Sequence, residues 1–307
     1  MRHESILVIG GSGFIGSHIV AQLVATGRKV IVPTRRYDRA RHLLVLPTVQ
    51  IVEADIFDDA TLAALVKKAD VVINLIGILH SRPGPSGSSW GRQFERAHVE
   101  LVRKVVAACN AASVKRCLHM SALGVSSDAP SMYLRSKAAG EKIMLNASDL
   151  DVTIFRPSVV FGQEDKFLNL FARLQHFMPL LVLGGAEAKF QPVYVMDVAK
   201  AFVLALEDHQ SFGKIYELAG PKVYTLRELI RLAGQYSGHV RPLIGLPYAL
   251  ARLQAWLLEF MPGGPLMSRD NVDSMQADNI ATSHNQSLAG WHPMPLEAVA
   301  PYYLGRH

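Results

Sequence analysis

The stretch Gly10–His18 reads GGSGFIGSH, and its glycines Gly10, Gly13 and Gly16 follow the spacing GxxGxxG. It comes after the apolar run SILVIG and opens FIGSHIVAQLVATG, whose apolar residues recur at helical spacing. Glycines in such a turn let backbone N–H groups approach a pyrophosphate, and the N-terminus of the following helix adds partial positive charge. This strand–turn–helix context predicts a dinucleotide site rather than a glycine-rich turn without a ligand.

Strand and helix patterns alternate through the first half of the chain. Further strands are expected at KVIVPT (29–34), VQIVEAD (49–55), DVVINLIGIL (70–79), RCLHMSA (116–122) and DVTIFRPSVVFG (151–162). Helices are expected between them, at 58–69 with Asp58 or Asp59 as N-cap, from about Trp90 to Ala112, and around 131–141. This rhythm predicts an α/β fold with a doubly wound parallel sheet and helices on both faces.

The chain is expected to divide unevenly. Residues 1–162 form the predicted dinucleotide-binding domain, to which strands and helices from about 189–219 return, and 163–307 form a smaller C-terminal α/β substrate or partner region. Within this region, PYALARLQAWLLEFMP (247–262) predicts a helix with one apolar face. Such a stripe is usually core, with docking on a membrane or partner as the weaker alternative. The apolar side chains of this face are Leu250, Leu253, Trp256, Leu257 and Phe260.

Composition narrows the class of protein. A net charge of +6 suits a polyanionic cofactor or an anionic membrane surface, but no Lys/Arg run resembles a nucleic-acid tail, so we expect no nucleic-acid partner. Cys109 and Cys117 fall in an expected helix and strand, without metal-ligand spacing or a disulfide framework. The first strand begins at once, and no apolar run approaches the ~18 residues of a membrane span. We therefore expect a cytoplasmic protein without a metal site, at most peripheral to a membrane.

The end of the second strand addresses cofactor choice. An acid there would bind the ribose 2′-hydroxyl of NAD, but PTRRYD offers Arg35 and Arg36, which suit a 2′-phosphate. NADP(H) is therefore favoured over NAD(H), with two solvated arginines near Asp38 as the alternative. Asp55, after the third strand, is a candidate acceptor for the adenine amino group or a simple capping acid.

With these residues in view, the chain resembles the extended short-chain dehydrogenase/reductases, whose fold is of the Rossmann type. The motifs that carry the resemblance occur in the family's order: GGSGFIG, EADIFD, INLIG, HMSALG, YLRSK, FRPSVVFG and QPVYVMDVAKA. HMSALGV, RSKAAGE, FRPSVVFG and YELAGPKVYTLREL are especially similar to one atypical branch. That branch contains the nucleotide-binding accessory subunit of mitochondrial respiratory complex I and its bacterial relatives.

The resemblance assigns roles to residues of this chain. It implies that the glycine turn holds the pyrophosphate, that the third strand end flanks adenine, that the fourth lines the adenosine ribose and phosphates, and that Pro157 packs near the nicotinamide. The residues concerned are Gly10, Ser12, Gly13, Phe14, Ile15 and Gly16, then Asp55 and Ile56, then Leu75, Ile76 and Gly77.

The stretch SMYLRSKAAGE (131–141) carries the candidate reaction centre. Tyr133 and Lys137 are four apart, so on a helix they share one face. In the family the tyrosine donates or accepts the proton, and the lysine binds the nicotinamide ribose. A nearby ammonium and a positive nicotinamide favour phenolate, so we expect the tyrosine pKa to fall below its usual ~10. The alternative is two residues on the exposed face of an ordinary helix.

The rest of the family's catalytic group is less complete. Ser121 is the candidate hydroxyl after the fifth strand, although alignment on the strand end puts Ala122 in that position instead. An asparagine is usual in the preceding long helix, where this chain has His98. Histidine at this place can support a water-mediated proton path, but packing on or exposure along the helix face is expected.

Two functions remain open. One is an NADP(H)-dependent reductase, epimerase or dehydratase, in which Tyr133 handles the proton of a carbonyl or hydroxyl substrate. The other is an NADP(H)-binding structural or regulatory protein, associated with a membrane enzyme of the respiratory chain or a quinone pathway. The C-terminal region shows no charged cluster diagnostic of nucleotide-sugars, so the substrate stays unassigned.

Overall fold

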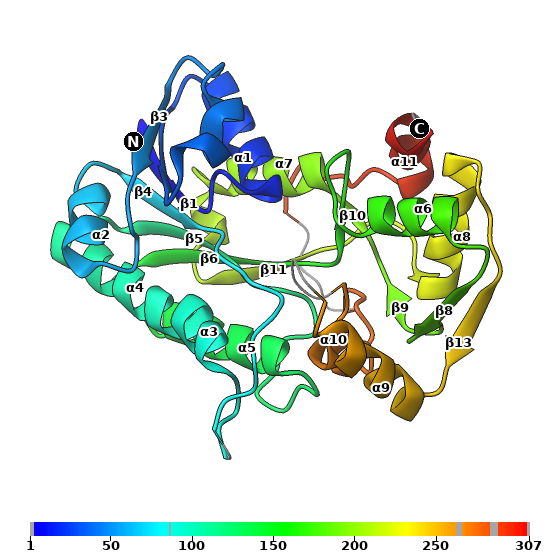
Figure 1. Ribbon diagram of the computed structural model, residues 1–307. Helices are drawn as coiled ribbons and strands as arrows, with labels where there is room; N and C mark the ends of the chain where they lie inside the picture. Colours follow the sequence, from blue (N-terminus) through cyan, green and yellow to red (C-terminus); the bar gives the residue numbers. More distant parts are fainter. Residues whose placement is uncertain (1–2, 86, 262–265, 283–287, 306–307) are drawn as a thin grey trace.

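Seven parallel strands form the central sheet of the computed structural model, which describes residues 3–85, 87–261, 266–282 and 288–305 (Figure 1). The order across the sheet is β11-β6-β5-β4-β1-β2-β3, and all neighbours are parallel. Their bounds are β1 (Ser5–Ile9), β2 (Lys29–Thr34), β3 (Val49–Glu53), β4 (Val71–Asn74), β5 (Arg116–Met120), β6 (Asp151–Pro157) and β11 (Lys214–Leu218). The predicted doubly wound sheet is confirmed. From β1 the strands follow one another outward in both directions, through β2 to β3 and through β4 to β11, and sheets of this kind bind ligands at the crevice between the two central strands, here β1 and β4.

Helices cover both faces of the sheet, as Figure 1 shows. On one face, α1 (Phe14–Ala25) packs on α7 (Val195–Ala205) over a core with Val8, Val32 and Phe202. On the other, α2 (Asp59–Val66), α4 (Leu101–Ala112) and α5 (Met132–Leu145) cover a core with Leu7 and Val72. Both faces of the sheet are therefore buried under helices, which explains why the strands are almost continuously apolar.

The helix expected from Trp90 begins at Arg92 and is not regular. It consists of α3 (Arg92–Phe94), the π-helix η2 (Glu95–Glu100) and α4. π-Helical turns are rare and often mark functional sites, and this one carries His98. At α2, Asp58 is the N-cap, because its carboxylate accepts a hydrogen bond from the Thr61 N–H at 2.8 Å. The 3-10 helices are η1 (Tyr37–Leu43) and η3 (His209–Ser211).

Arg116, on β5, joins the sheet to the end of α7. It is 1% exposed and donates to the carbonyls of Leu206 at 3.2 Å and Asp151 at 2.7 Å. Its guanidinium also donates to the Ser211 hydroxyl at 2.9 Å, and burial lowers its pKa to about 10. The charge is thus compensated by carbonyls of two segments, the end of α7 and the start of β6, and by a hydroxyl of a third, η3.

Short strands and helices make up the remainder beyond β6. The pairs are β7 (Val160–Phe161) with β10 (Val193–Tyr194), β9 (Lys189–Phe190) with β12 (Tyr224–Thr225), and β8 (Leu181–Gly184) with β13 (Leu243–Leu246). The helices are α6 (Leu168–Phe177), α8 (Leu226–Ser237), α9 (Tyr248–Leu258), α10 (Arg269–Ser274) and α11 (Leu296–Leu304). α6, α8 and α11 share one core around Phe171, Leu229 and Ala300. β11 and α7, although late in the chain, lie in the large sheet and on its face.

The apolar stripe of α9 differs from expectation. Ala251 and Ala255 are the fully buried residues of this helix, whereas Leu253 and Trp256 are 52% and 41% exposed. The prediction that the stripe is core was therefore wrong: small alanines face the protein, and the large side chains face outward. Among the described residues, no helix is both long and apolar enough to cross a bilayer.

Candidate functional site

The glycine turn joins β1 to α1 at the point where chain order reverses. Gly10 has φ +88°, a backbone conformation that L side chains rarely adopt. A Cβ on Gly16 would lie 2.2 Å from the Gly10 carbonyl oxygen, so the first helical turn can press against the loop only with glycine there. Gly13 is the N-cap of α1 and no side chain caps the helix, which leaves its first N–H groups open to an anion. The turn therefore fits a pyrophosphate.

Arg35 and Arg36 follow β2 at the same edge of the sheet, and both are exposed. Asp38, the nearby acid, forms an ion pair with Arg41 at 2.7 Å. Within the described residues, neither Arg35 nor Arg36 has an ion-pair partner. Two guanidinium groups are thus free at the position where a dinucleotide's adenosine ribose is held in this fold.

The ends of β3 and β4 supply the next candidate residues. Asp55 is exposed, and its carboxylate accepts a hydrogen bond from the Phe57 N–H at 3.0 Å, so it acts as a loop-capping acid in this structure. Ile56 is buried beside it in the core. After β4, the Ile76 N–H donates to the Asn74 side chain at 3.2 Å. A Cβ on Gly77 would meet only the Lys137 ammonium, at 3.9 Å, which leaves room above this strand end.

Lys137 projects from α5 to the ends of the strands. Its ammonium donates to the carbonyl of Met120 at 2.6 Å and lies 3.5 Å from that of Ile76. The side chain is 3% exposed, and burial lowers its pKa to about 8, partly opposed by Glu141. Glu141, one turn further, is paired with Arg156 on β6. The Lys137 ammonium thus lies at the carboxyl ends of β4 and β5.

Tyr133 lies four residues earlier on α5, and within the described residues its hydroxyl has no hydrogen-bond partner. Burial raises its pKa to about 12, and the Asp270 carboxylate adds to the rise. The expectation of a lowered tyrosine pKa is therefore wrong for the protein without cofactor, because burial and the Asp270 carboxylate both disfavour the phenolate. At neutral pH the phenol is protonated and can donate but not accept a proton.

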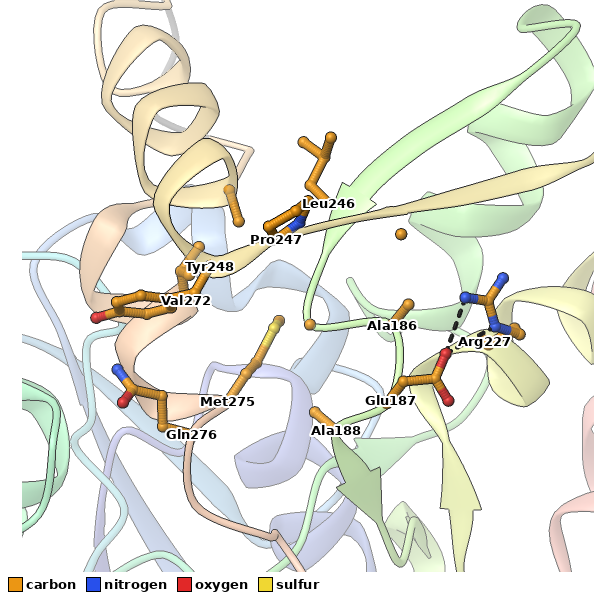
Figure 2. Close-up of a pocket in the computed structure, with 13 residues that line it drawn as sticks. Ala186, Glu187, Ala188, Arg227, Leu246, Pro247, Tyr248, Val272, Met275 and Gln276 are labelled. Atoms are coloured by element: carbon orange, nitrogen blue, oxygen red, sulfur yellow. Dashed lines mark hydrogen bonds and ion pairs between the residues drawn. The ribbon is translucent and has the colours of Figure 1, made fainter.

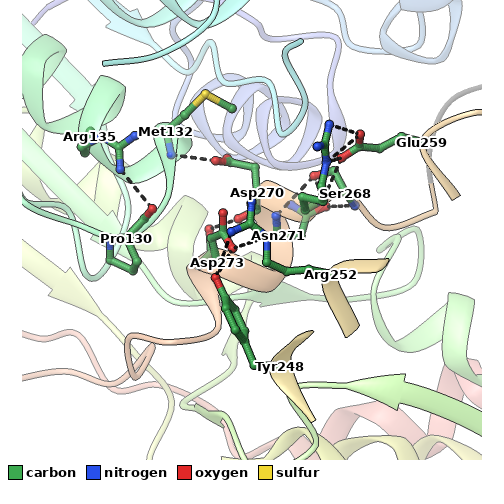
Figure 3. Close-up of polar contacts among 12 residues, drawn as sticks. Pro130, Met132, Arg135, Tyr248, Arg252, Glu259, Ser268, Asp270, Asn271 and Asp273 are labelled. Atoms are coloured by element: carbon green, nitrogen blue, oxygen red, sulfur yellow. Dashed lines mark hydrogen bonds and ion pairs between the residues drawn. The ribbon is translucent and has the colours of Figure 1, made fainter. Parts of the chain in front are cut away.

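Asp270, on α10, was not singled out from the sequence. Its carboxylate accepts a hydrogen bond from the N–H of Met132 at 2.6 Å (Figure 3). It accepts a second from the N–H of Tyr133 at 3.0 Å. It therefore completes the N-terminus of α5, where Ser131 is the N-cap. The acid follows its partners by 137 or more residues, so no local pattern could have revealed it.

Ser121 follows β5 directly after the carbonyl that binds Lys137. Its N–H donates to the Phe155 carbonyl at 2.7 Å, but its hydroxyl is buried without any hydrogen-bond partner among the described residues. An unpaired buried hydroxyl is costly and points to a ligand that would bind it. Ala122, the alternative at this position, is buried. Pro157 lies beside the same loop, because its carbonyl accepts a hydrogen bond from the Leu123 N–H at 3.0 Å.

His98 is buried at 1% exposure against α5, in agreement with the expectation of packing on the helix face. Its Nε2 accepts a hydrogen bond from the Ile78 N–H at 3.1 Å, so Nδ1 carries the proton and donates to the Ser136 hydroxyl at 2.8 Å. Burial lowers the His98 pKa to about 2. Both nitrogens are therefore engaged, and the ring ties the loop after β4 to the helix of Tyr133.

A pocket of about 430 Å³ lies beyond α10 (Figure 2). Val272 and Met275 line it, whereas Asp270 on the same helix contacts α5. Its lining is mainly apolar, and the ion pair of Glu187 with Arg227 at 2.8 Å closes one side. The residues that line it are Gly185, Ala186, Glu187, Ala188, Arg227, Gly245, Leu246, Pro247, Tyr248, Ala251, Val272, Met275 and Gln276.

Comparisons with known proteins agree with this geometry. The model of the NAD dependent epimerase/dehydratase family matches residues 6–219. The chain is 35% identical over 294 residues to NADH dehydrogenase [ubiquinone] 1 alpha subcomplex subunit 9, mitochondrial, of Arabidopsis thaliana, covering 90% of this chain and 71% of that one. The Mus musculus protein of the same name is 33% identical, with 98% and 79% covered. The NADH-ubiquinone oxidoreductase 40 kDa subunit of Neurospora crassa is 29% identical, with 97% and 78% covered.

Solved structures support the fold. A UDP-glucuronic acid 4-epimerase from Bacillus cereus, determined with UDP-glucuronic acid and NAD, superposes with a TM-score of 0.71 at 21% identity, covering 98% of both chains. A nucleoside-diphosphate-sugar epimerase from Staphylococcus aureus gives a TM-score of 0.75 at 16% identity, covering 98% of this chain and all of that one. From its glycine turn, its sheet and these relatives, the chain belongs to the NAD dependent epimerase/dehydratase family, the extended short-chain dehydrogenase/reductases.

Proposed function

We propose that this protein binds a nicotinamide dinucleotide and prefers NADP(H) to NAD(H). The observation that carries the preference is the pair of exposed guanidinium groups, Arg35 and Arg36, at the end of β2, where the nearby Asp38 is already paired with Arg41. A 2′-phosphate there would meet two cations without competition from that acid. NAD(H) would lose this contact.

The remaining binding residues follow the strand ends. N–H groups of the turn would hold the pyrophosphate, Asp55 and Ile56 would flank adenine, and the β4 end would lie along the ribose and phosphates. Lys137 would bind the nicotinamide ribose, and Pro157 would pack near the ring. The turn and the β4 end consist of Gly10, Ser12, Gly13, Phe14, Ile15 and Gly16, and of Leu75, Ile76 and Gly77.

We place the protein with the respiratory chain or quinone metabolism, as a nucleotide-bound component at the inner, cytoplasmic face of a membrane. Support comes from relatives in a plant, a mammal and a fungus, whose names make them subunits of NADH dehydrogenase or NADH-ubiquinone oxidoreductase. The commitment of both His98 nitrogens to Ile78 and Ser136 also favours a binding role, because the family's usual asparagine is replaced by a group that holds structure.

A second function, reduction of a carbonyl substrate, is favoured by Ser121, Tyr133 and Lys137. A bound nicotinamide would supply the hydride. The unpartnered Ser121 hydroxyl would orient the substrate oxygen, and the protonated Tyr133 would donate the proton that this oxygen needs. A tyrosine pKa raised to about 12 keeps the phenol protonated at neutral pH in the cofactor-free protein, as a proton donor for reduction requires.

Calorimetric titration of cofactor-free protein with NADPH and NADH tests the binding proposal. We expect NADPH to bind at least ~10-fold more tightly than NADH, a difference of ~1.4 kcal/mol in binding free energy. The Arg35→Ala/Arg36→Ala double variant should abolish this preference for NADPH. The matched control, Arg173→Ala/Arg231→Ala, removes two exposed arginines from α6 and α8 and should keep the preference. Equal affinities in the wild type, or an unchanged preference in the double variant, would refute the 2′-phosphate assignment.

Turnover separates the two functions. NADPH oxidation is followed with a panel of quinones and other carbonyl compounds, for the wild type and Tyr133→Phe. Turnover that disappears with the hydroxyl supports the reductase. Tight NADPH binding with no turnover on any compound supports the binding role.

A further inference from the structure

The outward face of α9 is an apolar surface of unusual density. We call it the α9 surface: it consists of Leu250, Leu253, Trp256, Leu257 and Phe260, which are between 41% and 71% exposed. The Trp256 and Phe260 rings contact each other edge to face, with centroids 5.4 Å apart. Large contiguous apolar surfaces are uncommon on monomeric proteins and mark interaction sites.

The packing of α9 fixes this orientation. Its inward face carries Ala251 and Ala255, and a Cβ on Gly184 would lie only 2.1 Å from the Cβ of Ala251. The helix therefore lies so close to β8 that a large side chain has no room on this side. The bulky residues therefore point away from β8, because a larger side chain at position 251 would collide with the backbone at Gly184.

Two polar side chains of α9, Arg252 and Gln254, and its C-cap residue Glu259 contact other parts of the protein; Figure 3 shows Arg252 and Glu259. Arg252 lies 3.6 Å from Asp273, and Glu259 forms an ion pair with Arg269 at 2.9 Å. The Gln254 amide donates to a carbonyl of β8 at 2.7 Å. The α9 surface itself thus presents hydrocarbon and aromatic rings with no charged group among its members. Protein interfaces usually include about one hydrogen bond per 100–200 Å², and this surface offers few groups to make them.

The loop after β4, which carries two arginines, comes near the C-terminal end of α9 at His80. Glu259, at that end, acts on the pKa of His80, which burial lowers, so the loop after β4 approaches α9 here. Residues 78–94 contain Arg82 and Arg92 and no acidic residue. Arg82 and Arg92 are exposed, and so is Leu79. An apolar helix face near a loop with two exposed arginines and no acid, on a chain of net charge +6, matches the chemistry of an anionic lipid surface, where apolar side chains enter the headgroup boundary and arginines meet lipid charge.

We infer that the α9 surface docks the protein on membranes that contain anionic lipid. The helix lies in the interfacial plane with Trp256 and Phe260 among the headgroups, and the loop arginines contact lipid phosphate. This inference specifies how the protein in the proposed function reaches its membrane, but it does not depend on cofactor choice or turnover. Each can fail alone, because α9 contributes no residue to the nucleotide site.

Co-sedimentation with vesicles tests the inference on the full chain. Phosphatidylcholine vesicles with and without 30% phosphatidylglycerol, a composition that we choose, are compared at low and high salt. We expect binding to the anionic vesicles that weakens with salt, and a loss of at least ~10-fold in the variant Leu253→Ser/Trp256→Ser/Leu257→Ser. Arg82→Ala/Arg92→Ala should reduce the dependence on phosphatidylglycerol. Wild-type Trp fluorescence should shift to shorter wavelength on binding, and Trp256→Phe should remove most of that shift.

The matched control is Val45→Ser/Phe177→Ser/Tyr302→Ser, which removes three exposed apolar side chains elsewhere and should bind vesicles like the wild type. Both triple variants should keep the wild-type circular dichroism spectrum and NADPH affinity, which separates this test from that of the nucleotide site. The inference is overturned if the wild type binds neither vesicle type, or if the α9 triple variant binds the anionic vesicles as well as the wild type does. A dimer in light scattering that the α9 variant dissociates, without vesicle binding, would assign the surface to a second copy of the chain instead.

Discussion

The carboxylate of Asp270 accepts a hydrogen bond from the backbone N–H of Tyr133 at 3.0 Å, so an acid from α10 holds the first turn of the helix that carries the candidate proton donor. The same carboxylate is among the causes of the high Tyr133 pKa, and its own pKa is raised, chiefly by burial. One residue of the C-terminal region thereby affects both the position and the acidity of the phenol. A displacement of α10 is therefore expected to change both the start of α5 and the Tyr133 pKa.

Replacing Asp270 with Asn should weaken both effects. The amide can accept from only one side, so one N–H of the α5 terminus loses its partner, and we expect a loss of roughly 1–3 kcal/mol in unfolding free energy. The Tyr133 pKa should fall from about 12, because the negative charge is removed. Denaturant unfolding measures the first effect. Tyrosinate absorbance, compared with and without Tyr133→Phe, measures the second.

Asp273→Asn is the control for this experiment. It lies on the same helix but contacts Arg252 and the Tyr248 hydroxyl rather than α5. It should leave the Tyr133 titration unchanged. If Asp270→Asn leaves both the stability and the titration at wild-type values, the link between α10 and the phenol does not exist.

Local sequence patterns sufficed for the parts of the protein that local physics determines. The strand runs, the glycine turn and the spacing of Tyr133 and Lys137 depend on neighbours a few residues away. The structure has the predicted sheet, with the glycine turn after β1 and the Lys137 ammonium at the end of β5. Contacts between distant segments could not be predicted in this way. Asp270 reaches α5 across the fold, and the Tyr133 pKa depends on burial and on that acid.

The α9 face shows a different limit of prediction. Helical periodicity correctly places Leu253, Trp256 and their neighbours on one face, but periodicity does not say which of two apolar faces turns inward. That choice depends on the close approach of Gly184 to Ala251, which brings together residues 67 positions apart (251 minus 184). The π-helical turn at His98 is similar, because its buried contacts with Ile78 and Ser136 come from separate elements.

Ser121→Ala should separate a ligand-binding hydroxyl from a structural one. Because this hydroxyl is buried without a partner, its removal should raise the unfolding free energy of the cofactor-free protein by about 1 kcal/mol. The same variant should bind substrate or cofactor less tightly, or lower any turnover. Ser158→Ala is the contrast, since the Ser158 hydroxyl donates to the Asn279 side chain at 2.6 Å and its loss should destabilise. A destabilised Ser121→Ala would mean that this hydroxyl has a structural partner in solution.

Gly16→Ala and Gly13→Ala should differ in a way that tests the pyrophosphate site. A Cβ at position 16 would overlap the Gly10 carbonyl oxygen at 2.2 Å, so this variant should lose both stability and NADPH binding. A Cβ at position 13 would lie 3.4 Å from that oxygen, an ordinary contact, so Gly13→Ala should fold normally. It should nevertheless bind NADPH at least ~10-fold more weakly, because its methyl group occupies the approach to the turn. Calorimetry and thermal unfolding give the two readouts, and unimpaired NADPH binding by Gly13→Ala would place the phosphates elsewhere.

His98 should make the protein sensitive to mild acid. Its pKa is about 2 in the folded chain, against about 6.5 when unfolded, so only the unfolded state gains a proton as the pH falls below 6.5. The stabilising contribution of the neutral ring is therefore complete above pH 6.5 and is lost progressively below it, by roughly 3 kcal/mol at pH 4.5. His119, whose pKa burial lowers well below its usual value, acts in the same direction. Denaturant unfolding from pH 7.5 to 4.5 should show a slope that His98→Gln reduces and that a change at the exposed His42, His42→Gln, leaves intact. Equal slopes in wild type and His98→Gln would mean that the ring takes up its proton in the folded protein, and that its hydrogen bond to Ile78 does not hold the loop after β4.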